Sequence, residues 1–406
     1  DIKQFRQMSS KTPGHPEYRM TTGVETTTGP LGQGCANSVG MAMAERWLGK
    51  RFNRDGQVLF DYNVYTLCGD GDMMEGISGE AASMAGHLKL DNLCWIYDNN
   101  TISIEGHTEL AFSEDVIKRF QAYGWHTLHV TDANDLQALS EALQTFQRTT
   151  GAPTLIVVDS VIGYGSPHKH NTAAAHGEPL GDEEIRLTKA AYGWPEDSSF
   201  LVPDEARNVL RDALLERSRP LYEAWNQSLS QLDQAEPALA DELRRMRAGE
   251  MPQHWQDDLP SFDSDAKGVA SRAAGGEVLN AFARHIPWLL GGSADLTGSN
   301  NTKAKVDPKN NKVSNPVVEK PKAAPPPRRR GLRGARADRP ATGDRRTARR
   351  SGRRTGRGDG GRDRHVADLA EGPLRQPRPG QWPAQPAPVS YGSARRSFAL
   401  RGRNGL

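Results

Sequence analysis

The sequence predicts an α/β fold in which a doubly wound, mainly parallel sheet occupies the first half of the chain. Short apolar runs typical of buried strands occur at 64–68, 93–97, 126–130 and 154–158. Longer segments with good helix formers and an apolar face lie between them, and this alternation indicates βαβ units. Ligands of such sheets bind beyond the carboxyl ends of the strands.

The elements follow one another in a regular order. A glycine-rich turn, Gly-Pro-Leu-Gly-Gln-Gly at 29–34, leads into a helix expected over 38–48. The helix expected over 78–88 has small residues that allow close packing on a sheet. A further helix, at 136–147, separates the last two strands.

After the predicted sheet the pattern changes. Residues 205–251 are charged, helical in pattern and punctuated by Pro220 and Pro237, which indicates a connector between domains. A helix at 277–282 and a strand at 288–290 then run into Gly-Gly-Ser-Ala-Asp at 291–295. We expect a second α/β domain to begin there.

Charge divides the chain into two unlike parts. The formal net charge is +2, but the stretch from Arg328 to the end holds 21 arginines, no lysine and 6 acidic residues. This stretch contributes +15, which leaves −13 for residues 1–327. A nucleic-acid footprint needs clustered positive charge, so the acidic main part argues against nucleic acid as its partner.

Beyond about Val306 the chain has too few apolar residues to bury a core. Three interpretations stay open for this segment. It could be a basic tail that binds nucleic acid or another acidic partner, or a disordered segment without function. The abrupt change to Arg, Pro, Gly and Ala is also typical of out-of-frame translation of a GC-rich gene. We hypothesise a frameshift between Lys303 and Pro327, which an uninterrupted native reading frame in the DNA would exclude.

Cysteine usage and hydropathy bear on location. Cys35, Cys68 and Cys94 lie in apolar surroundings without paired spacing, which favours a reducing compartment over a disulfide framework. No apolar run is long enough to span a membrane, and no signal peptide is visible. We therefore expect a cytoplasmic protein without a membrane partner. The chain begins at 1–6 in what reads as the middle of a helix, so we expect native residues upstream.

Polar residues follow two of the predicted strands. Asp70, between Gly69 and Gly71, follows the 64–68 strand, and Asn100 and Ile102 follow the 93–97 strand. Mg²⁺ prefers carboxylate, amide or backbone oxygens together with the oxygens of a bound phosphate. The Asp70 carboxylate, the Asn100 side chain and the Ile102 carbonyl offer such oxygens, and the glycines would let a diphosphate approach the backbone.

This pattern predicts a metal–diphosphate clamp, with a chance turn as the alternative, because asparagine is also a common turn residue. A dinucleotide site is disfavoured, since neither 69–76 nor 29–34 has the G-x-G-x-x-G spacing.

Several motifs together closely resemble the thiamine-diphosphate segment of transketolases. They are Lys-Gln-Phe-Arg-Gln at 3–7, Lys-Thr-Pro-Gly-His-Pro-Glu at 11–17, the turn at 29–34, Gly-Asp-Gly-Asp-Met-Met-Glu-Gly-Ile-Ser-Gly-Glu-Ala-Ala-Ser at 69–83, Ala-Gly-His-Leu-Lys-Leu at 85–90, Tyr-Asp-Asn-Asn-Thr-Ile-Ser-Ile-Glu-Gly at 97–106 and Gly-Gly-Ser-Ala-Asp-Leu at 291–296. The resemblance extends over most of the chain before the arginine-rich segment. Dihydroxyacetone synthase and deoxyxylulose-phosphate synthase are relatives, and the motifs at 11–17 and 291–296 favour transketolase over the latter.

The resemblance implies a set of cofactor and metal contacts. Asp70, Asn100 and the Ile102 carbonyl match the family's ligands for Mg²⁺, for which Ca²⁺ is another candidate. Gly71 and Asn100 match contacts to the diphosphate of the cofactor, thiamine diphosphate. A further match is the loop Gly29, Pro30 and Leu31, for which a bare helix-entry turn is the structural alternative.

The resemblance also implies substrate contacts. His176 matches a histidine that contacts both cofactor and substrate, and it is our candidate for a catalytic hydrogen-bonding or proton-transfer role, although a lone loop histidine is more often solvated. Arg272 and Ser299 match positions that hold the sugar-phosphate group, where the planar fork of arginine suits phosphate oxygens. Asp295 matches an active-site position.

The domain organisation implied by the resemblance is a thiamine-diphosphate-binding fold. It consists of a diphosphate-binding domain at 1–237 that lacks its N-terminal part, a connector and the start of a pyrimidine-binding domain at 238–306, and a low-complexity, disordered segment at 307–406.

The implied activity is transfer of a two-carbon ketol (glycolaldehyde) unit from a ketose phosphate to an aldose phosphate, in the pentose phosphate pathway or the Calvin cycle. The family's homodimers hold the cofactor between two subunits. Upstream histidines and a second-domain glutamate of the family are not found in this sequence, so we expect the chain to be inactive by itself. A non-catalytic product whose basic tail binds acidic partners is the alternative.

Overall fold

The computed structural model describes residues 1–264, 267–293 and 296–304. The chain divides into two units, Asp1–Arg328 and Arg329–Leu406. The segment 307–406, predicted to be a disordered basic tail, lies outside the described residues, as does the position of the hypothesised frameshift from 305 onward. The predicted domain boundaries at 237 and 306 stay predictions.

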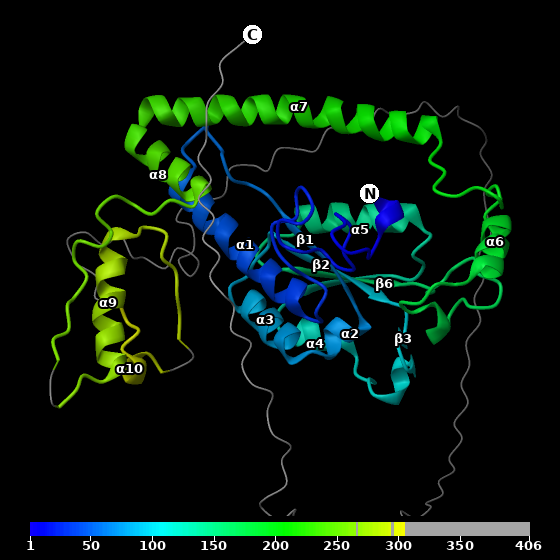
Figure 1. Ribbon diagram of the computed structural model, residues 1–406, viewed down its shortest axis with the longest axis horizontal. Helices are drawn as coiled ribbons and strands as arrows, with labels where there is room; N and C mark the ends of the chain where they lie inside the picture. The colour runs from blue at the N-terminus through cyan, green and yellow to red at the C-terminus, as the bar shows by residue number, and fades with distance from the viewer. Residues whose placement is uncertain (265–266, 294–295, 305–406) are drawn as a thin grey trace, which may run out of the picture. The chain divides into compact units, whose positions relative to one another are not determined.

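A four-stranded parallel sheet forms the centre of the first unit (Figure 1). Its strands are β1 (Val64–Gly69), β2 (Leu93–Asn99), β5 (His126–Val130) and β6 (Thr154–Asp159). The order across the sheet is β1-β2-β6-β5, so β6, the last of them in sequence, lies between β2 and β5. The register pairs Gly69 with Asp98 and Asn99 with Asp159, which brings the carboxyl ends of β1, β2 and β6 level with one another.

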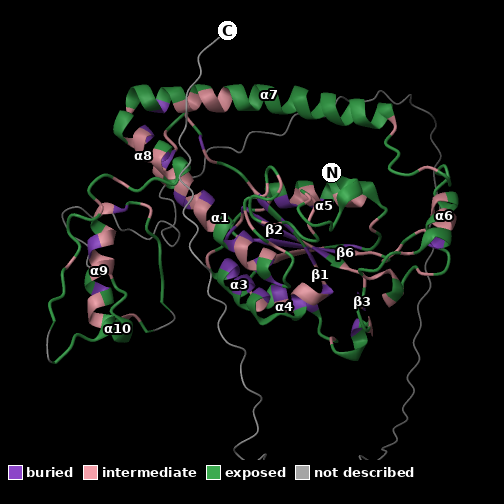
Figure 2. Ribbon diagram, viewed as in Figure 1, coloured by how far each residue is buried: buried purple, intermediate pink, exposed green. Residues whose placement is uncertain are grey.

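Helices cover both faces of this sheet, as the doubly wound prediction requires. α1 (Gln33–Phe52), α3 (Gly76–His87) and α4 (Val116–Ala122) pack on one face, and α5 (Leu136–Arg148) packs on the other (Figure 1). The buried residues lie mainly along the strands and on the inner sides of these helices (Figure 2). The inner strands β2 and β6 are buried along most of their length because both of their faces are covered, whereas β1, at one edge of the sheet, alternates buried and exposed residues.

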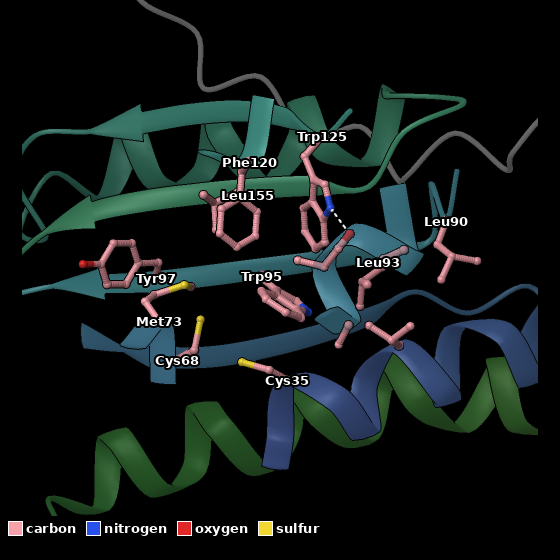
Figure 3. Close-up of a cluster of buried hydrophobic side chains, with 14 of the residues drawn as sticks. Cys35, Cys68, Met73, Leu90, Leu93, Trp95, Tyr97, Phe120, Trp125 and Leu155 are labelled. Carbon is pink, nitrogen blue, oxygen red and sulfur yellow. Dashed lines mark hydrogen bonds between the residues drawn. The ribbon is translucent and has the colours of Figure 1, made fainter. Parts of the chain in front are cut away.

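An aromatic cluster fills the face under α1, α3 and α4. The ring of Trp95 lies 5.0 Å from that of Trp125 and 5.7 Å from that of Phe120, centroid to centroid, and the three rings meet at steep angles (Figure 3). Burying an aromatic or large aliphatic side chain stabilises the fold by about 1.5–3 kcal/mol. The Trp125 indole also donates to the Ala82 carbonyl, 2.8 Å away, which fixes α3 on the sheet.

Close packing of α3 depends on its small residues, as predicted. A Cβ atom added to Gly86 would lie 1.9 Å from the carbonyl oxygen of Tyr123, which follows α4. Ala81, Ala82 and Ala85 of the same helix are buried. The helix therefore approaches its neighbours more closely than larger side chains would permit.

The opposite face has a smaller core. Phe146 and Ala142 of α5 pack on Cys94, Ile156 and other strand residues. α5 begins at a capped end, because the Asp135 carboxylate accepts a hydrogen bond of 2.9 Å from the Ala138 N–H. Cys35, Cys68 and Cys94 are all buried and free, which agrees with their unpaired spacing.

The connector contains two helices, α7 (Asp204–Ala235) and α8 (Pro237–Ala248), preceded by α6 (Asp182–Ala191). Our expectation that Pro220 interrupts the helical pattern is wrong, because α7 runs through it. Pro237 takes the first position of α8, where a missing N–H costs no helical hydrogen bond. Leu232 of α7 and Leu243 of α8 pack with Trp47 of α1 in a separate apolar cluster.

Two further expectations need correction. The segment 1–6 is not part of a regular α-helix: only a 3₁₀ turn, η1 (Ile2–Gln4), forms, and the chain reverses at Arg6, whose φ is +61° and whose N–H donates to the Thr12 carbonyl. The predicted helix at 277–282 is confirmed as part of α9 (Ser271–His285). The predicted strand at 288–290 is wrong, because Trp288 lies in a turn and packs against the apolar cluster of α7 and α8.

A short helix, α10 (Thr297–Asn300), follows. Among the described residues, no helix combines the length and the apolar character that crossing a membrane requires.

Candidate metal and diphosphate site

Asp70 lies at the point where β1 ends and a short helix, α2 (Asp70–Met74), begins. Only 4% of its surface is exposed, and both carboxylate oxygens accept hydrogen bonds. The Tyr97 hydroxyl donates to Oδ1 at 2.6 Å, and the Thr101 backbone N–H donates to Oδ2 at 3.0 Å. The structure therefore brings the predicted carboxylate against the loop that carries Asn100 and Ile102.

That loop is held in a strained conformation. Thr101 has a φ of +60°, in the left-handed region that a β-branched residue rarely adopts. Its N–H bond to Asp70 helps to offset the strain, which is a feature typical of ligand-binding sites.

Hydrogen bonds within the loop set the orientation of the Asn100 side-chain oxygen and of the Ile102 carbonyl. The Asn100 side chain donates to Asp98 Oδ2 at 3.1 Å and accepts from the Ile102 N–H at 3.0 Å, so its oxygen is oriented and keeps a second lone pair. Ile102 begins β3 (Ile102–Ser103), which pairs with β4 (Gly106–His107). Thr101 accepts from Thr108, and by antiparallel alternation the Ile102–His107 pair is not hydrogen-bonded, so the Ile102 carbonyl points away from β4.

Asp72 joins the glycine-rich loop at 29–34 to the glycine-rich segment that follows β1. Asp72 of α2 accepts from the Gly32 N–H at 2.8 Å through Oδ1 and from the Gly69 N–H at 2.9 Å through Oδ2. The loop at 29–34 is thereby fixed beside the end of β1. The sequence carries a signal only for the bond to Gly69, since an acidic residue at the third position of a helix commonly accepts from the N–H of the residue before the helix.

Contacts between these loops leave no room for larger side chains. A Cβ atom on Gly71 would lie 3.2 Å from Leu31 Cδ1, so the two predicted cofactor residues lie next to each other. Gly29 has a φ of +114°, and a Cβ atom there would lie 2.4 Å from the His15 ring. His15 therefore lies against the predicted cofactor loop, a position that its place in the 11–17 motif did not reveal to us.

A series of hydrogen bonds, which we call the polar chain, crosses the carboxyl edge of the sheet. Tyr97 of β2 contacts Asp70 at 2.6 Å and Asn99 Oδ1 at 3.1 Å. The Asn99 amide donates to Asp159 Oδ1 of β6 at 2.8 Å, and Asp159 Oδ2 lies 2.8 Å from His129 Nε2 of β5. The polar chain thus links Asp70 to all the remaining strands of the parallel sheet.

The electrostatics of the site suit a cation. Burial raises the pKa of Asp70 above its ordinary value, and the charge of Asp98 adds to this rise, whereas the hydrogen bonds from Tyr97 and Thr101 oppose it. A nearby positive charge favours the ionised form of a carboxylate. One carboxylate, one amide oxygen and one backbone carbonyl are a donor set that Mg²⁺ and Ca²⁺ accept, so the residues present fit a divalent cation.

His176 lies on the loop between β6 and α6, directly after a 3₁₀ turn, η3 (Ala173–Ala175). Its backbone N–H donates to the Ala173 carbonyl at 2.9 Å. Its Nδ1 is buried, and none of the described residues offers it a hydrogen bond. A buried ring nitrogen without a protein partner is a reasonable contact for a ligand.

Glu184 of α6 anchors the loop that carries His176. Its carboxylate accepts hydrogen bonds from the Ser166 hydroxyl, from the His168 N–H at 2.8 Å and from His168 Nδ1 at 2.9 Å. These hydrogen bonds, of which the one from Ser166 has the largest effect, lower the pKa of Glu184 to about 2. Lys169 adds a bond of 2.8 Å from its ammonium group to the Leu180 carbonyl, which joins the start of the loop to its end just before α6.

The predicted sugar-phosphate residues lie on other elements. Arg272 of α9 and Ser299 of α10 are exposed. The two helices contact each other, since a Cβ atom on Gly276 would lie 2.8 Å from Asn301 Cβ. Within the described part of the chain, no hydrogen bond joins Arg272 or Ser299 to Asp70 or its loop, and Asp295 lies outside the described residues. The roles of these residues stay predictions, as do those of the other predicted site residues.

Comparisons with known proteins agree with this geometry. Residues 1–252 match the family model described as transketolase, thiamine diphosphate binding domain. The chain is 50% identical to a transketolase of Geobacillus stearothermophilus over 305 residues. These residues make up 75% of this chain and 46% of that relative. The chain spans about half the length of the curated relatives it matches.

Solved structures give the same result. A transketolase from Leishmania mexicana matches with a TM-score of 0.71 and 42% identity, over 74% of this chain and 44% of that one. A transketolase from Pichia stipitis in complex with sedoheptulose 7-phosphate matches with a TM-score of 0.71 and 42% identity, over 75% of this chain and 45% of that one.

Proposed function

The chain belongs to the transketolase family, and on this premise we propose that it holds the diphosphate of thiamine diphosphate through a divalent cation bound to Asp70, Asn100 and the Ile102 carbonyl. The observation that carries the proposal is the buried Asp70 carboxylate, which accepts hydrogen bonds from Tyr97 and Thr101 at the carboxyl edge of the sheet. A buried carboxylate is costly to ionise unless a positive charge lies nearby, and a divalent cation would supply that charge.

The glycine loops would accommodate the diphosphate. Gly71 follows Asp70 directly, and its lack of a side chain lets Leu31 of the 29–34 loop pack against its backbone, so this loop lies beside Asp70. Asp72 keeps the two loops together. These contacts orient a bound diphosphate, and the buried surroundings strengthen each electrostatic interaction.

Thiamine diphosphate, when bound, supplies an acidic thiazolium carbon that lets a two-carbon ketol unit pass from a ketose phosphate to an aldose phosphate. We propose that His176 donates or accepts a hydrogen bond at the ligand through its buried Nδ1. Sugar phosphates as substrates are supported by the Pichia stipitis complex with sedoheptulose 7-phosphate. Arg272 and Ser299 are our candidates for the sugar-phosphate group.

We also propose a homodimer as the active assembly, a place in the pentose phosphate pathway or the Calvin cycle, and a cytoplasmic location, which the free thiols of Cys35, Cys68 and Cys94 support. The described residues would contact only the diphosphate side of the cofactor. We therefore propose that this chain by itself does not complete ketol transfer. A coupled assay of ketol transfer on the purified chain tests this, and robust turnover would contradict it.

Cofactor binding is tested by calorimetric titration of the full chain with thiamine diphosphate, in Mg²⁺, in Ca²⁺ and in chelator. We expect binding only when a divalent cation is present. Asp70→Asn should weaken it by roughly 100-fold or more, because a charged ligand of the cation is lost. Asp135→Asn is the matched control, since asparagine also caps the start of α5. Metal-independent binding, or equal affinity of the two variants, would contradict the proposal.

A further inference from the structure

We propose that Tyr97 is a positioning residue for the metal ligand Asp70, because its hydroxyl holds the carboxylate in the orientation that a divalent cation needs. This inference rests on the proposed function of Asp70. Tyr97 would not contact the cation or the substrate; it would act by restricting the carboxylate.

The hydroxyl is placed for this role by the packing of its ring. Tyr97 is 2% exposed and belongs to the aromatic and aliphatic core under α1, α3 and α4. In Figure 3 its ring lies nearest the arrowheads of the strands, with the hydroxyl pointing away from Trp95. The core therefore fixes the ring, and the oxygen projects to the edge of the sheet where Asp70 lies.

The hydrogen bonds to Asp70 divide its two oxygens. Tyr97 donates to Oδ1 at 2.6 Å and Thr101 donates to Oδ2 at 3.0 Å, so rotation of the carboxylate about χ2 would break both bonds. An ionised carboxylate has about four lone-pair sites. The sites left after these two bonds are those available to a cation, and the donors decide where they point.

The polar chain restrains Tyr97 in turn. Asn99 donates its amide to Asp159, so its oxygen faces the Tyr97 hydroxyl at 3.1 Å. A hydroxyl has a single proton, and the shorter contact, 2.6 Å to a carboxylate, is in the range of a charge-assisted bond. We therefore infer that the hydroxyl of Tyr97 donates its proton to the hydrogen bond with Asp70, and that the Asn99 oxygen is a weaker second acceptor.

Partners that orient a metal ligand commonly contribute 10–100-fold to metal affinity. Tyr97→Phe removes the hydroxyl and keeps the ring in the core. Mg²⁺ requires a near-octahedral shell and the slightly larger Mn²⁺ favours six oxygen ligands, whereas Ca²⁺ accepts a wider range of geometry and coordination number. If the Asp70 carboxylate loses its orientation, the affinity for Mn²⁺ should therefore fall more than the affinity for Ca²⁺. A general loosening of the protein would lower both affinities alike.

The experiment uses the full chain with saturating thiamine diphosphate. Free Mn²⁺ is measured by electron paramagnetic resonance during titration, and Ca²⁺ affinity is obtained by competition. For Tyr97→Phe we expect the Kd for Mn²⁺ to rise by about 10-fold or more and the preference to shift toward Ca²⁺. Tyr65→Phe is the matched control, because it removes an exposed hydroxyl from β1 that accepts a long hydrogen bond of 3.5 Å from the Gln147 amide.

The outcomes separate the two proposals. If wild-type protein binds Mn²⁺ and Tyr97→Phe binds it equally well, or loses Mn²⁺ and Ca²⁺ affinity in the same proportion, the positioning role is overturned while the clamp stands. If wild-type protein binds no Mn²⁺ at all, the clamp and the positioning role both fall. The inference is supported if Tyr97→Phe loses more affinity for Mn²⁺ than for Ca²⁺ while its unfolding midpoint without ligands matches that of Tyr65→Phe.

Discussion

Asp72→Asn should separate the two glycine-rich loops without touching the proposed metal ligands. The Asp72 carboxylate accepts from Gly32 at 2.8 Å and from Gly69 at 2.9 Å. Asparagine has one oxygen and one amino group, so it can accept only one of these bonds and presents a donor to the other N–H. The variant therefore loses one bond and leaves two donors facing each other.

The size of the effect follows from these two contacts. A hydrogen bond to a charged group contributes about 1.5–3 kcal/mol, and a neutral one about 0.5–1.5 kcal/mol. The variant loses one charged bond and weakens the other, but Asp72 is partly exposed, so water can satisfy the released N–H. We expect the free energy of unfolding to fall by about 2 kcal/mol, which is a large part of the 5–15 kcal/mol typical of a domain.

Urea unfolding followed by tryptophan fluorescence measures the stability, and calorimetry measures the affinity for thiamine diphosphate with Mg²⁺. Asp61→Asn is the control, since Asp61 is exposed and precedes β1. We expect the cofactor affinity of Asp72→Asn to fall as well, because Leu31 would no longer be held beside Gly71. An Asp72→Asn protein as stable as Asp61→Asn, with unchanged affinity, would show that the loops are held by something else.

Two further predictions concern packing and pH. Gly86→Ala should lower the thermal unfolding midpoint, because its Cβ atom would lie 1.9 Å from the Tyr123 carbonyl oxygen, and overpacking costs about 1–3 kcal/mol. Gly79→Ala in the same helix, where the nearest atom is 3.5 Å away, should instead raise the midpoint, through a gain of up to about 1 kcal/mol in helix propensity; two changes of equal sign would contradict this account. The pKa of Glu184 lies at about 2 against an ordinary 4.5, so its bonds to the His176 loop stabilise the fold above pH 4.5 and are lost as the pH falls toward 2. The difference in unfolding midpoint between wild-type protein and Glu184→Gln should shrink over that window, and a constant difference would refute the assignment.

Much of the sheet could be predicted from the sequence because buried parallel strands leave a local signal. The runs that became β1, β2, β5 and β6 are apolar and bounded by turn residues, and their carboxyl ends share one edge by the rule for parallel sheets. That rule alone was enough to predict that Asp70 lies close to the loop of Asn100. The same reasoning located the glycine turn before α1.

The remainder depends on contacts that have no local signal. Tyr97 reads as one apolar position of a strand, and only the fold shows that its hydroxyl reaches Asp70. Trp288 has the composition of a strand but packs on a helix pair instead, because tertiary burial decides short apolar runs. Pro220 illustrates the opposite case, where a strong local rule gave way to the continuity of a long helix.

The order of the strands has a consequence for how the protein folds. β6 is inserted between β2 and β5, although it is synthesised after both, so the sheet cannot close until residues as far as Asp159 have left the ribosome. Pairings between distant segments form slowly, because the chain must pay for loop closure first. The cofactor edge, whose polar chain passes through β6, is therefore completed late, and a ligand bound there should slow unfolding rather than speed folding.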